Sequence, residues 1–553
     1  MINVERLDTM QTKVKKRILF ILCGIVALAI VLTGGWFVWQ YYFPTKVVYT
    51  MTKNVEQTIS TKAPELPYDL DFQKTVKAEL DQKKAEKDYT IDQPLVVLNP
   101  YGTNVLSAYV YFNTERKALM EYTVSSAGVP DFTQTAYTED ASGATTHEYQ
   151  IIGLTPEAEN TITIRMKNKQ NRILYEKQIT VTAPKMMSAT QKKLEKETVT
   201  EGKELSEGLY LTIGPDFKSP NRGSSAFYDN DGYIRGEIPV NENYRIDRLT
   251  FRGNQMLYTY DNNVFAVVNR LGMVEDIYQL TGYTMHHDYT LTDDGKLIIL
   301  ASKDGAETVE DRIICYDPST RKTTELVDMA KLLPDYKKIT STDKETLDWI
   351  HFNSVTMLSN DTAVFSSRET STIMKIKDLF NNPTIDYMIG DESIWEDFSY
   401  KNLLLKKEGD FVSQAGQHSV TYQPDESLPE GQYYLYMYNN NYGAMTTRRS
   451  YDWSNIPGVG DFNKGEKSMA YKYLVDEKAK TYQLVWSKDV AYSPIVSATQ
   501  QMDNGNYVIE SGCAKVFQEC TKDGQTIANF KVDVKTYFYR VYKYTMKNFW
   551  FQG

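Results

Sequence analysis

From residue 93 onward, apolar and polar positions alternate in short segments that are separated by turns rich in Asp, Asn and Gly. Alternation with a period of two predicts β-strands that are buried on one face. The chain has 41 Tyr against 21 Phe, which fits such strands because the tyrosine ring packs while its hydroxyl meets water. The pattern therefore predicts an all-β protein over this part of the chain.

Six of these segments fall between residues 93 and 184, with short polar turns between them. So many short strands in so few residues predict a small β-sandwich domain. One stretch of this region, IIGLTPEAENTITIRMKN, resembles the loop-to-strand corner of fibronectin type III-like domains. A lone histidine of this region, His147, is expected to be a surface or strand residue.

A longer region, residues 223–553, repeats a unit made of a strand, a turn of Asp, Asn or Gly, and a more apolar strand. Six units of this kind follow one another at irregular intervals. Repeats that each form one small antiparallel sheet predict a β-propeller, here with six blades. A Lys- and Glu-rich stretch within residues 185–222 is predicted to be the linker between sandwich and propeller.

The N-terminal part has a different pattern, because residues 18–39 form a nearly uncharged apolar run. At a rise of about 1.5 Å per residue, such a run can cross a bilayer core of roughly 30 Å. Basic residues cluster before it within residues 1–17, and Trp and Tyr cluster at its far end. This arrangement predicts a single-pass membrane helix with residues 1–17 in the cytoplasm and the remainder outside the cell. Residues 40–92 are predicted to be a stalk or linker that contains a charged surface helix.

A cleaved signal peptide is the alternative interpretation of this N-terminal run. The apolar stretch of a signal peptide is usually shorter, and no small-residue cleavage motif follows the run here. The anchor is therefore preferred, although cleavage is left open. The formal charge of −10 and the isoelectric point near 5.3 argue against a nucleic-acid partner.

The space outside the cell is oxidising, so cysteines in this part of the chain can form disulfides. Cys513 and Cys520 are seven residues apart around a predicted hairpin, so a local disulfide between them is one interpretation and two buried thiols the other. No paired CxxC motif occurs in the chain, so no structural zinc site is predicted.

The chain has only five histidines, and four of them occupy equivalent places in the repeat. His286 with His287, His351, and His418 each stand at the start of a unit, just before its first strand. Equivalent positions of successive blades surround one axis, so these side chains are expected to meet at one mouth of the central channel. Arg368 ends a strand of the unit that His351 begins. Guanidinium and imidazole donors together predict a pocket for a tetrahedral oxyanion.

Two other interpretations of this cluster stay open. The HHD triplet at residues 286–288 can ligate a metal ion, although Arg368 would repel a cation and no HExxH spacing is present. The same residues can also be packing and hydrogen-bonding elements of the blade mouths. In the anion-pocket interpretation, by contrast, a histidine that titrates near neutrality acts as a nucleophile or a proton carrier.

Three motifs resemble the bacterial aryl-sulfate sulfotransferase family. They are DWIHFNSV…SSR at residues 348–368, HHDYTLTDDGKLIILAS at residues 286–302, and GQHS at residues 416–419. The resemblance covers roughly residues 90–553, and the DW-x-H-x-N-S…SSR element is its most specific part. It implies a β-sandwich before a six-bladed propeller, and transfer of a sulfuryl group from an aryl sulfate to a phenol without a nucleotide donor, a metal or an organic cofactor.

The resemblance also implies roles for individual residues. His418 would be the nucleophile that carries the sulfuryl group in a ping-pong cycle. The other predicted site residues, which hold the sulfuryl oxygens or contact the substrate, are Arg368, His351, Asn353, and one of the pair His286 and His287. The second member of the pair is preferred because Asp288 follows it, as in the HHD motif.

Some features of the chain depart from the Gram-negative members of that family. Their disulfide upstream of the nucleophilic histidine has no counterpart here, and the chain has an anchor in place of a periplasmic signal. The expected partners are small aryl sulfates and phenols, and the membrane through the N-terminal helix; a homodimer is left open.

The competing interpretation is a non-catalytic extracellular propeller that binds or adheres, since such folds host many functions. A sulfatase that uses water as acceptor is less favoured, because no C/S-x-P-x-R motif is present.

Overall fold

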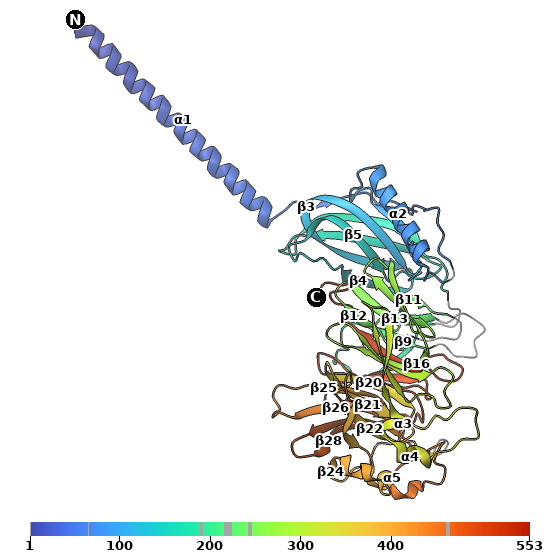
Figure 1. Cartoon of the computed structure of the whole chain (residues 1–553). Coiled ribbons are helices and arrows are strands. Elements are labelled where there is room, and N and C mark those ends of the chain that lie inside the picture. The colour runs from blue at the N-terminus through green and yellow to red at the C-terminus, as the bar shows by residue number, and fades with distance from the viewer. Residues whose placement is uncertain (1, 65, 188–191, 215–223, 242–245, 461–464) are drawn as a thin grey trace.

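The computed structural model describes the chain apart from residues 1, 65, 188–191, 215–223, 242–245 and 461–464. A long N-terminal helix, a β-sandwich and a β-propeller follow one another along the chain (Figure 1). This all-β architecture confirms the fold class that the strand pattern predicts.

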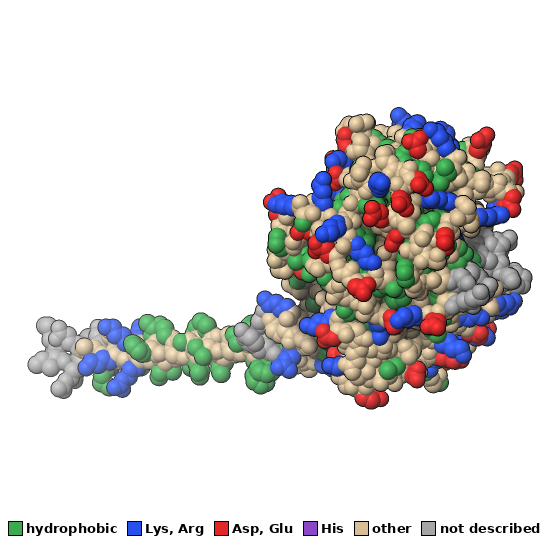
Figure 2. All heavy atoms as spheres, turned by 90° about the horizontal axis from the view of Figure 1, so that it is seen from below, with side chains coloured by type: hydrophobic (Ala, Val, Ile, Leu, Met, Phe, Trp, Pro, Cys, Tyr) green, Lys and Arg blue, Asp and Glu red, His purple; other side chains and the backbone are tan. Residues whose placement is uncertain are grey.

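Helix α1 (Ile2–Tyr42) contains the predicted apolar run and extends away from the folded parts in Figure 1. The stretch Thr9–Trp39 is long and apolar enough to cross a membrane, and none of its most apolar window is buried against protein. Apolar side chains cover the face of α1 that Figure 2 shows, with basic side chains toward its N-terminal end. The helix is therefore a candidate for a membrane span or a signal segment.

The β-sandwich is organised by one long strand, β3 (Ser107–Ser126), which takes part in two sheets. Its partners in the first sheet are β2 (Leu95–Leu98) and β5 (Ala144–Ile152), and those in the second are β4 (Val129–Thr135) and β6 (Glu159–Lys167), which β7 (Ile173–Thr182) extends. Val110 and Ile164, one from each sheet, are fully buried in one apolar core. His147 lies on β5 and is buried, and burial lowers its pKa to about 4.

The segment between α1 and the sandwich is built into the sandwich rather than forming a separate stalk. Strand β1 (Val47–Val48) pairs in parallel with β7. Helix α2 (Leu70–Glu86) begins at Asp69, whose carboxylate accepts the Phe72 backbone N–H at 2.7 Å as an N-cap. Although α2 is highly charged, Val76 on its inner face is fully buried in a cluster with strand residues of the sandwich.

The propeller has six blades, and the first strand of each lies nearest the axis. Blade 1 is β33 (Arg540–Tyr544), β9 (Leu209–Ile213), β10 (Ser224–Tyr228) and β11 (Ile234–Pro239). Blade 2 is β12 (Thr250–Arg252), β13 (Gln255–Asp261), β14 (Val264–Asn269) and β15 (Val274–Gln279). Blade 3 is β16 (Tyr283–Leu291), β17 (Leu297–Lys303), β18 (Arg312–Asp317) and β19 (Lys322–Asp328).

Blade 4 is β20 (Phe352–Ser359), β21 (Thr362–Ser367), β22 (Thr372–Lys377) and β23 (Thr384–Ile389). Blade 5 is β25 (His418–Gln423), β26 (Gln432–Asn439), β27 (Ser468–Asp476) and β28 (Thr481–Val490), with β24 (Lys406–Glu408) beside β28. Blade 6 is β29 (Ala498–Gln501), β30 (Tyr507–Ser511), β31 (Val516–Cys520), β32 (Thr526–Lys531) and β8 (Glu195–Thr198). The loops contain the short helices α3 (Met329–Leu332), α4 (Pro334–Lys338), α5 (Glu392–Trp395), η1 (Ser399–Leu403) and η2 (Trp453–Asn455).

Two strands from opposite ends of the propeller sequence close its ring. The C-terminal β33 pairs with β9 as the inner strand of blade 1, and β8 pairs with β32 as the outer strand of blade 6. Both β8 and β9 lie within the predicted linker, so part of that segment belongs to the propeller. Strand β8 is exposed along its whole length, which is why no apolar period reveals it in the sequence.

Buried charges stabilise this closure. Lys543 of β33 and Glu519 of β31 are fully buried and form an ion pair at 2.9 Å, and the hydroxyl of Tyr210 donates to Glu519 at 2.6 Å. Burial raises the pKa of the Glu519 carboxyl, but the Lys543 ammonium and these donors outweigh it and lower that pKa. On neighbouring β30, Glu510 is equally buried and makes no ion pair with the described residues, so burial raises its pKa well above the usual value.

These two glutamates predict opposite responses to Gln substitution. Glu510→Gln should raise the free energy of unfolding by roughly 1–3 kcal/mol at pH 8. The reason is that folding of the wild type forces this carboxyl to take up a proton at a pH where the unfolded chain would leave it ionised, and a glutamine avoids that cost. The gain should vanish as the pH falls to about 4.5, where the unfolded carboxyl is protonated too. Glu519→Gln should lower stability by about 3–5 kcal/mol, since Lys543 loses its buried partner. Denaturant unfolding of both variants at pH 8 and pH 5 measures this, and equal effects of the two would contradict it.

The disulfide considered between Cys513 and Cys520 does not form, because both thiols are free. Cys513 lies in the turn after β30, whereas Cys520 ends β31 opposite Tyr507, so the length of β31 separates them. Cys520 is buried, and burial raises its pKa to about 11. Of the two interpretations, the one of two buried thiols agrees with the structure for Cys520, whereas Cys513 is a free thiol that is only half-buried.

Candidate functional site

The structure brings the predicted histidines of three blades together at one end of the propeller channel. His286 and His287 lie at a bulge in β16, His351 directly precedes β20, and His418 begins β25. The Nε2 atoms of His287 and His351 are 3.1 Å apart, although 64 residues separate them in sequence. The His351 carbonyl oxygen accepts the backbone N–H of Arg368 at 3.1 Å, which sets the arginine beside it.

The backbone at these positions is unusual. His287, His351 and Ser419 have φ angles of 59°, 51° and 57°, in the left-handed region that residues other than glycine rarely adopt. Each such residue costs about 1–3 kcal/mol and persists only where the surroundings impose it, which is most often at functional sites. The left-handed turns aim the imidazoles of neighbouring blades at one another instead of along their own strands.

His418 is held with its Nε2 atom unprotonated. Its Nδ1 lies 2.8 Å from Asn440 Oδ1 and 2.9 Å from the Gly416 carbonyl oxygen, and both of these atoms only accept hydrogen bonds. The proton is therefore on Nδ1. Asn440 cannot turn to offer its amide N–H, because its Nδ2 donates to the carbonyl oxygens of Ser493 and Val496 at 2.7 and 2.9 Å.

The electrostatic surroundings keep His418 neutral. It is almost fully buried, and burial is the main cause that lowers its pKa well below the usual value. The hydrogen bond that Nδ1 donates to Asn440 opposes this effect of burial, and the positive charges of Arg368, His351 and Arg540 add to it. A neutral imidazole with a free Nε2 lone pair is the form that can attack an electrophile.

His351 has the opposite character. Its Nδ1 faces two carboxylates, Asp348 at 2.6 Å and Glu310 at 2.7 Å. Burial and the Arg368 guanidinium lower the pKa of His351, but these carboxylates outweigh them and raise it to about 9. The imidazole is therefore a cation at neutral pH. Fully buried Trp349, whose indole donates to Asp311 at 2.8 Å, anchors the loop that carries this histidine.

Arg368 contributes donors that the protein leaves unused. Its side chain is 17% exposed, and its Nη2 donates to Glu369 at 3.3 Å, the one partner of this guanidinium among the described residues. Glu369 is itself fixed, because it accepts the Thr447 backbone N–H at 2.6 Å. Most of the five N–H donors of this arginine are thus available to an anion beside His351.

Asn353, predicted to contact the substrate, is fully buried one strand position beyond His351's neighbour Phe352. Its side-chain Nδ2 donates to the carbonyl oxygen of Gln417 at 2.7 Å. This bond fixes the backbone immediately before His418, so the structure ties Asn353 to the position of that histidine.

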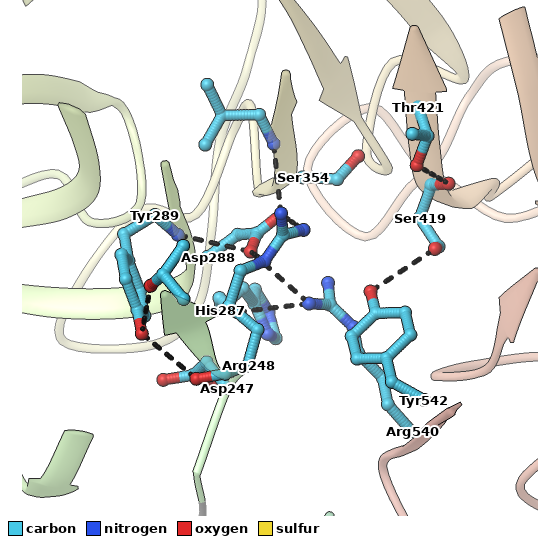
Figure 3. Close-up of polar contacts among 12 residues, drawn as sticks. Asp247, Arg248, His287, Asp288, Tyr289, Ser354, Ser419, Thr421, Arg540 and Tyr542 are labelled. Carbon is cyan, nitrogen blue, oxygen red and sulfur yellow. Dashed lines mark hydrogen bonds and ion pairs between the residues drawn. The ribbon is translucent and has the colours of Figure 1, made fainter. Parts of the chain in front are cut away.

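Buried charged side chains surround Asp288, next to His287 (Figure 3). The carboxylate of fully buried Asp288 contacts Nη2 of Arg248 at 2.8 Å and Nη1 of Arg540 at 3.4 Å, and it accepts the Val355 backbone N–H at 3.1 Å. Arg540 also donates to the Asn353 carbonyl oxygen at 2.7 Å. These contacts join inner strands of three blades and hold the left-handed segments in place.

Sequence reasoning missed several of these residues. Glu310 and Asp348 had no role assigned, and Asn440, Arg248 and Arg540 were not singled out. Asp348 carried a signal, since it lies in the DW-x-H motif, and Arg540 is a lone arginine in the apolar alternation YFYRVYKY. Glu310 carried none, because it is one of many acidic residues in polar loops.

Two overlapping groups of these side chains have a geometry that can hold a metal ion. Ligand atoms of His286, His287 and Glu310, and those of Glu310, Asp348 and His351, lie within 4.8 Å of one another. The carboxylates of both groups also form ion pairs with the imidazoles, and Arg368 adds a positive charge next to them. This favours an anion over a cation at the channel mouth.

The fold and the site together define a class of protein: a six-bladed propeller whose channel mouth carries one neutral and one charged imidazole beside an arginine. Two family models match the two folded parts. Residues 95–184 match the arylsulfotransferase Ig-like domain, and residues 194–548 match the arylsulfotransferase (ASST) family. The chain belongs to the arylsulfotransferase family, and this membership supports aryl sulfotransferase activity.

Other comparisons add little. No curated protein matches the chain. Among solved structures, a periplasmic gluconolactonase of Pseudomonas aeruginosa is 9% identical, covers 77% of this chain and 99% of its own, and has a TM-score of 0.33. An auxiliary nutrient binding protein of Bacteroides thetaiotaomicron is 10% identical, with 80% and 99% covered and a TM-score of 0.32. Scores this low place no constraint on function.

Proposed function

We propose that this protein transfers a sulfuryl group from a phenolic sulfate ester to a phenolic acceptor in a ping-pong cycle through a sulfated His418. The observation that carries the proposal is the state of His418. Its Nδ1–H is bonded to Asn440 and Gly416, which leaves the Nε2 lone pair of a neutral imidazole as the nucleophile.

The first half of the cycle is a displacement at sulfur. A bond forms from His418 Nε2 to sulfur while the bond from sulfur to the aryl oxygen breaks, and that oxygen leaves with the electron pair as a phenolate. Arg368 and His351 donate to the equatorial sulfuryl oxygens, with His287 beside them. Positioning and fixed cationic donors supply most of the catalysis in the closely related transfer of phosphoryl groups.

In the second half, a phenol takes the place of the departed one. Its oxygen attacks sulfur, the bond from sulfur to Nε2 breaks, and His418 regains its lone pair. A neighbouring imidazole protonates the leaving phenolate in the first half and accepts the proton of the incoming phenol in the second. No nucleotide sulfate donor takes part.

We also propose that α1 anchors the protein with its N-terminus inside the cell and the propeller outside. Four basic residues, Lys13, Lys15, Lys16 and Arg17, precede the apolar stretch, and aromatic residues lie at its other end.

An assay of the full-length protein in detergent tests the function. A chromogenic aryl sulfate is supplied with and without phenol, and the intact mass of the donor-treated protein is measured. Phenol-dependent release of the chromophore and a mass gain of about 80 Da support the proposal. Release that ignores phenol would instead indicate a hydrolase, and neither release nor adduct would indicate a binding protein. Turnover of a membrane-impermeant donor by intact cells tests the orientation.

A further inference from the structure

Glu310 links the imidazoles of two blades. It lies in the loop between β17 and β18, with its backbone in the left-handed region at φ 58°. One carboxylate oxygen contacts Nε2 of His286 in blade 3, and the other lies 2.7 Å from Nδ1 of His351 at the start of blade 4. A strained backbone conformation of this kind persists only where the surrounding structure imposes it, so the contacts with both blades hold Glu310 in position.

The main chain of Glu310 is fixed on both sides. Its N–H donates to Ser302 Oγ at 2.9 Å, and its carbonyl oxygen accepts the Phe352 N–H at 3.1 Å. Asp348 then approaches His351 Nδ1 at 2.6 Å from within the same loop as the histidine. Two carboxylates thus converge on one imidazole N–H at the mouth of the channel.

His287 does not have this environment, although it is the other imidazole at the pocket. Its Nδ1 lies 2.6 Å from the hydroxyl of Tyr539, a neutral phenol, and Glu310 is 3.8 Å from its Nε2. The two carboxylates beside His351 therefore favour a positive charge on this imidazole more than the tyrosine hydroxyl does on His287. The pKa of His351, about 9, means that this imidazole is protonated at neutral pH. That pKa is also close to the pKa of a phenol, about 10, so a proton can pass between the two groups in either direction.

We propose that Glu310, together with Asp348, is a positioning residue that makes His351 the proton carrier of the transfer reaction. The proposal rests on the proposed function. His351 Nε2, which lies 3.1 Å from His287 Nε2 in the structure, donates to the sulfuryl group of the bound donor. As the sulfur–oxygen bond breaks, this proton passes to the aryl oxygen, which leaves as a neutral phenol. His351 becomes a neutral imidazole whose Nδ1–H stays on the carboxylates. The incoming phenol returns a proton to Nε2 as its oxygen bonds to sulfur and the electron pair goes back to His418.

Several other groups near His351 also affect its pKa, but none of them stabilises the protonated imidazole as the carboxylates do. Those that face it are Arg368 at the end of β21, His286 and His287 on β16, His418 at the start of β25, and the two carboxylates themselves. The arginine and a protonated neighbour both oppose its positive charge, so among the described residues the two carboxylates are the groups that favour it.

The test is Glu310→Gln in the full-length protein in detergent, with Glu307→Gln as the matched control. Glu307 is an exposed glutamate of the same loop whose side chain makes no contact with the site residues described. The rate of the first phenol burst is measured across pH with aryl sulfates whose phenols differ in basicity. We expect Glu310→Gln to slow the burst about 100-fold with little change in KM, and to affect donors of basic phenols most.

The pH profile separates positioning from a structural role. The wild type should lose burst rate as the pH rises through the pKa of His351, about 9, because the proton to be donated is gone. Removing one carboxylate lowers that pKa, so the alkaline limb of Glu310→Gln should lie at lower pH, and Asp348→Asn should shift it in the same direction. Glu307→Gln should match the wild type.

An unshifted alkaline limb in both variants, or an equal loss for all donors, would overturn the inference. If Glu310→Gln does not fold, two other variants test the inference. Asp348→Asn should shift the alkaline limb to lower pH, and Glu310→Asp, which keeps a carboxylate on a shorter side chain, should retain part of the wild-type rate. Absence of turnover and of an adduct in the wild type would refute the proposed function itself, which is a different result.

Discussion

His418→Ala is expected to lower phenol-dependent turnover by about 10⁴-fold or more and to abolish the mass gain of the donor-treated protein. The reason is that no other described side chain at the pocket offers an uncharged, unprotonated nitrogen that is fixed in this way. Asn440 and Gly416 hold the Nδ1 side of the ring, so only Nε2 can bond to sulfur. Intact-mass analysis and the burst of released phenol measure the effect.

Two further variants make this result specific. His418→Asn keeps a polar group that can donate to Asn440, so it should fold and remain inactive. His147→Gln changes the buried histidine of the sandwich, far from the channel, and should still acquire the adduct. An adduct of unchanged yield on His418→Ala would mean that another residue is the nucleophile.

Arg368→Ala is expected to lower kcat by about 10²- to 10³-fold, which corresponds to roughly 3–4 kcal/mol of lost transition-state stabilisation. Its guanidinium keeps most donors free beside His351, where they can be fixed on the equatorial oxygens of the sulfuryl group in the transition state. Arg368→Lys should recover only part of the rate, because a single ammonium keeps the charge but not the planar fork.

The control for this prediction is Arg449→Ala. Arg449 is an exposed arginine that forms a surface ion pair with Asp343 at 2.8 Å, and its loss should leave kcat unchanged. Steady-state kinetics with one aryl sulfate and varied phenol compare the three variants. A rise in KM with an unchanged kcat in Arg368→Ala would show that this arginine only helps to bind the donor.

The period of the hydrophobic pattern predicted most of the fold. Each blade alternates inward and outward residues, so six units of strand, turn and strand were visible without any tertiary information. The pattern gave the wrong prediction for segments in which the apolar residues do not follow the burial seen in the structure. Strand β8 is wholly exposed and has no apolar period, and α2 is mostly charged although Val76 packs on the sandwich.

The histidines of the site were predicted for a similar reason. A propeller places equivalent positions of its blades around one axis, so the rarity and placement of His287, His351 and His418 were enough to expect a cluster. Their chemical states were not predictable. His418 and His351 are the same residue type in adjacent blades, yet one is neutral and the other charged.

The sequence by itself therefore determined the class of fold, the candidate membrane helix and the histidines that meet at the channel mouth, because these follow from periodicity, length and repeat position. Only the tertiary structure decided which imidazole carries a proton. That depends on acceptors and carboxylates brought from distant parts of the chain, such as Asn440 beside His418 and Glu310 beside His351. It also decided the fate of Cys513 and Cys520, since strand length and register, and not their spacing in the chain, set the distance between them.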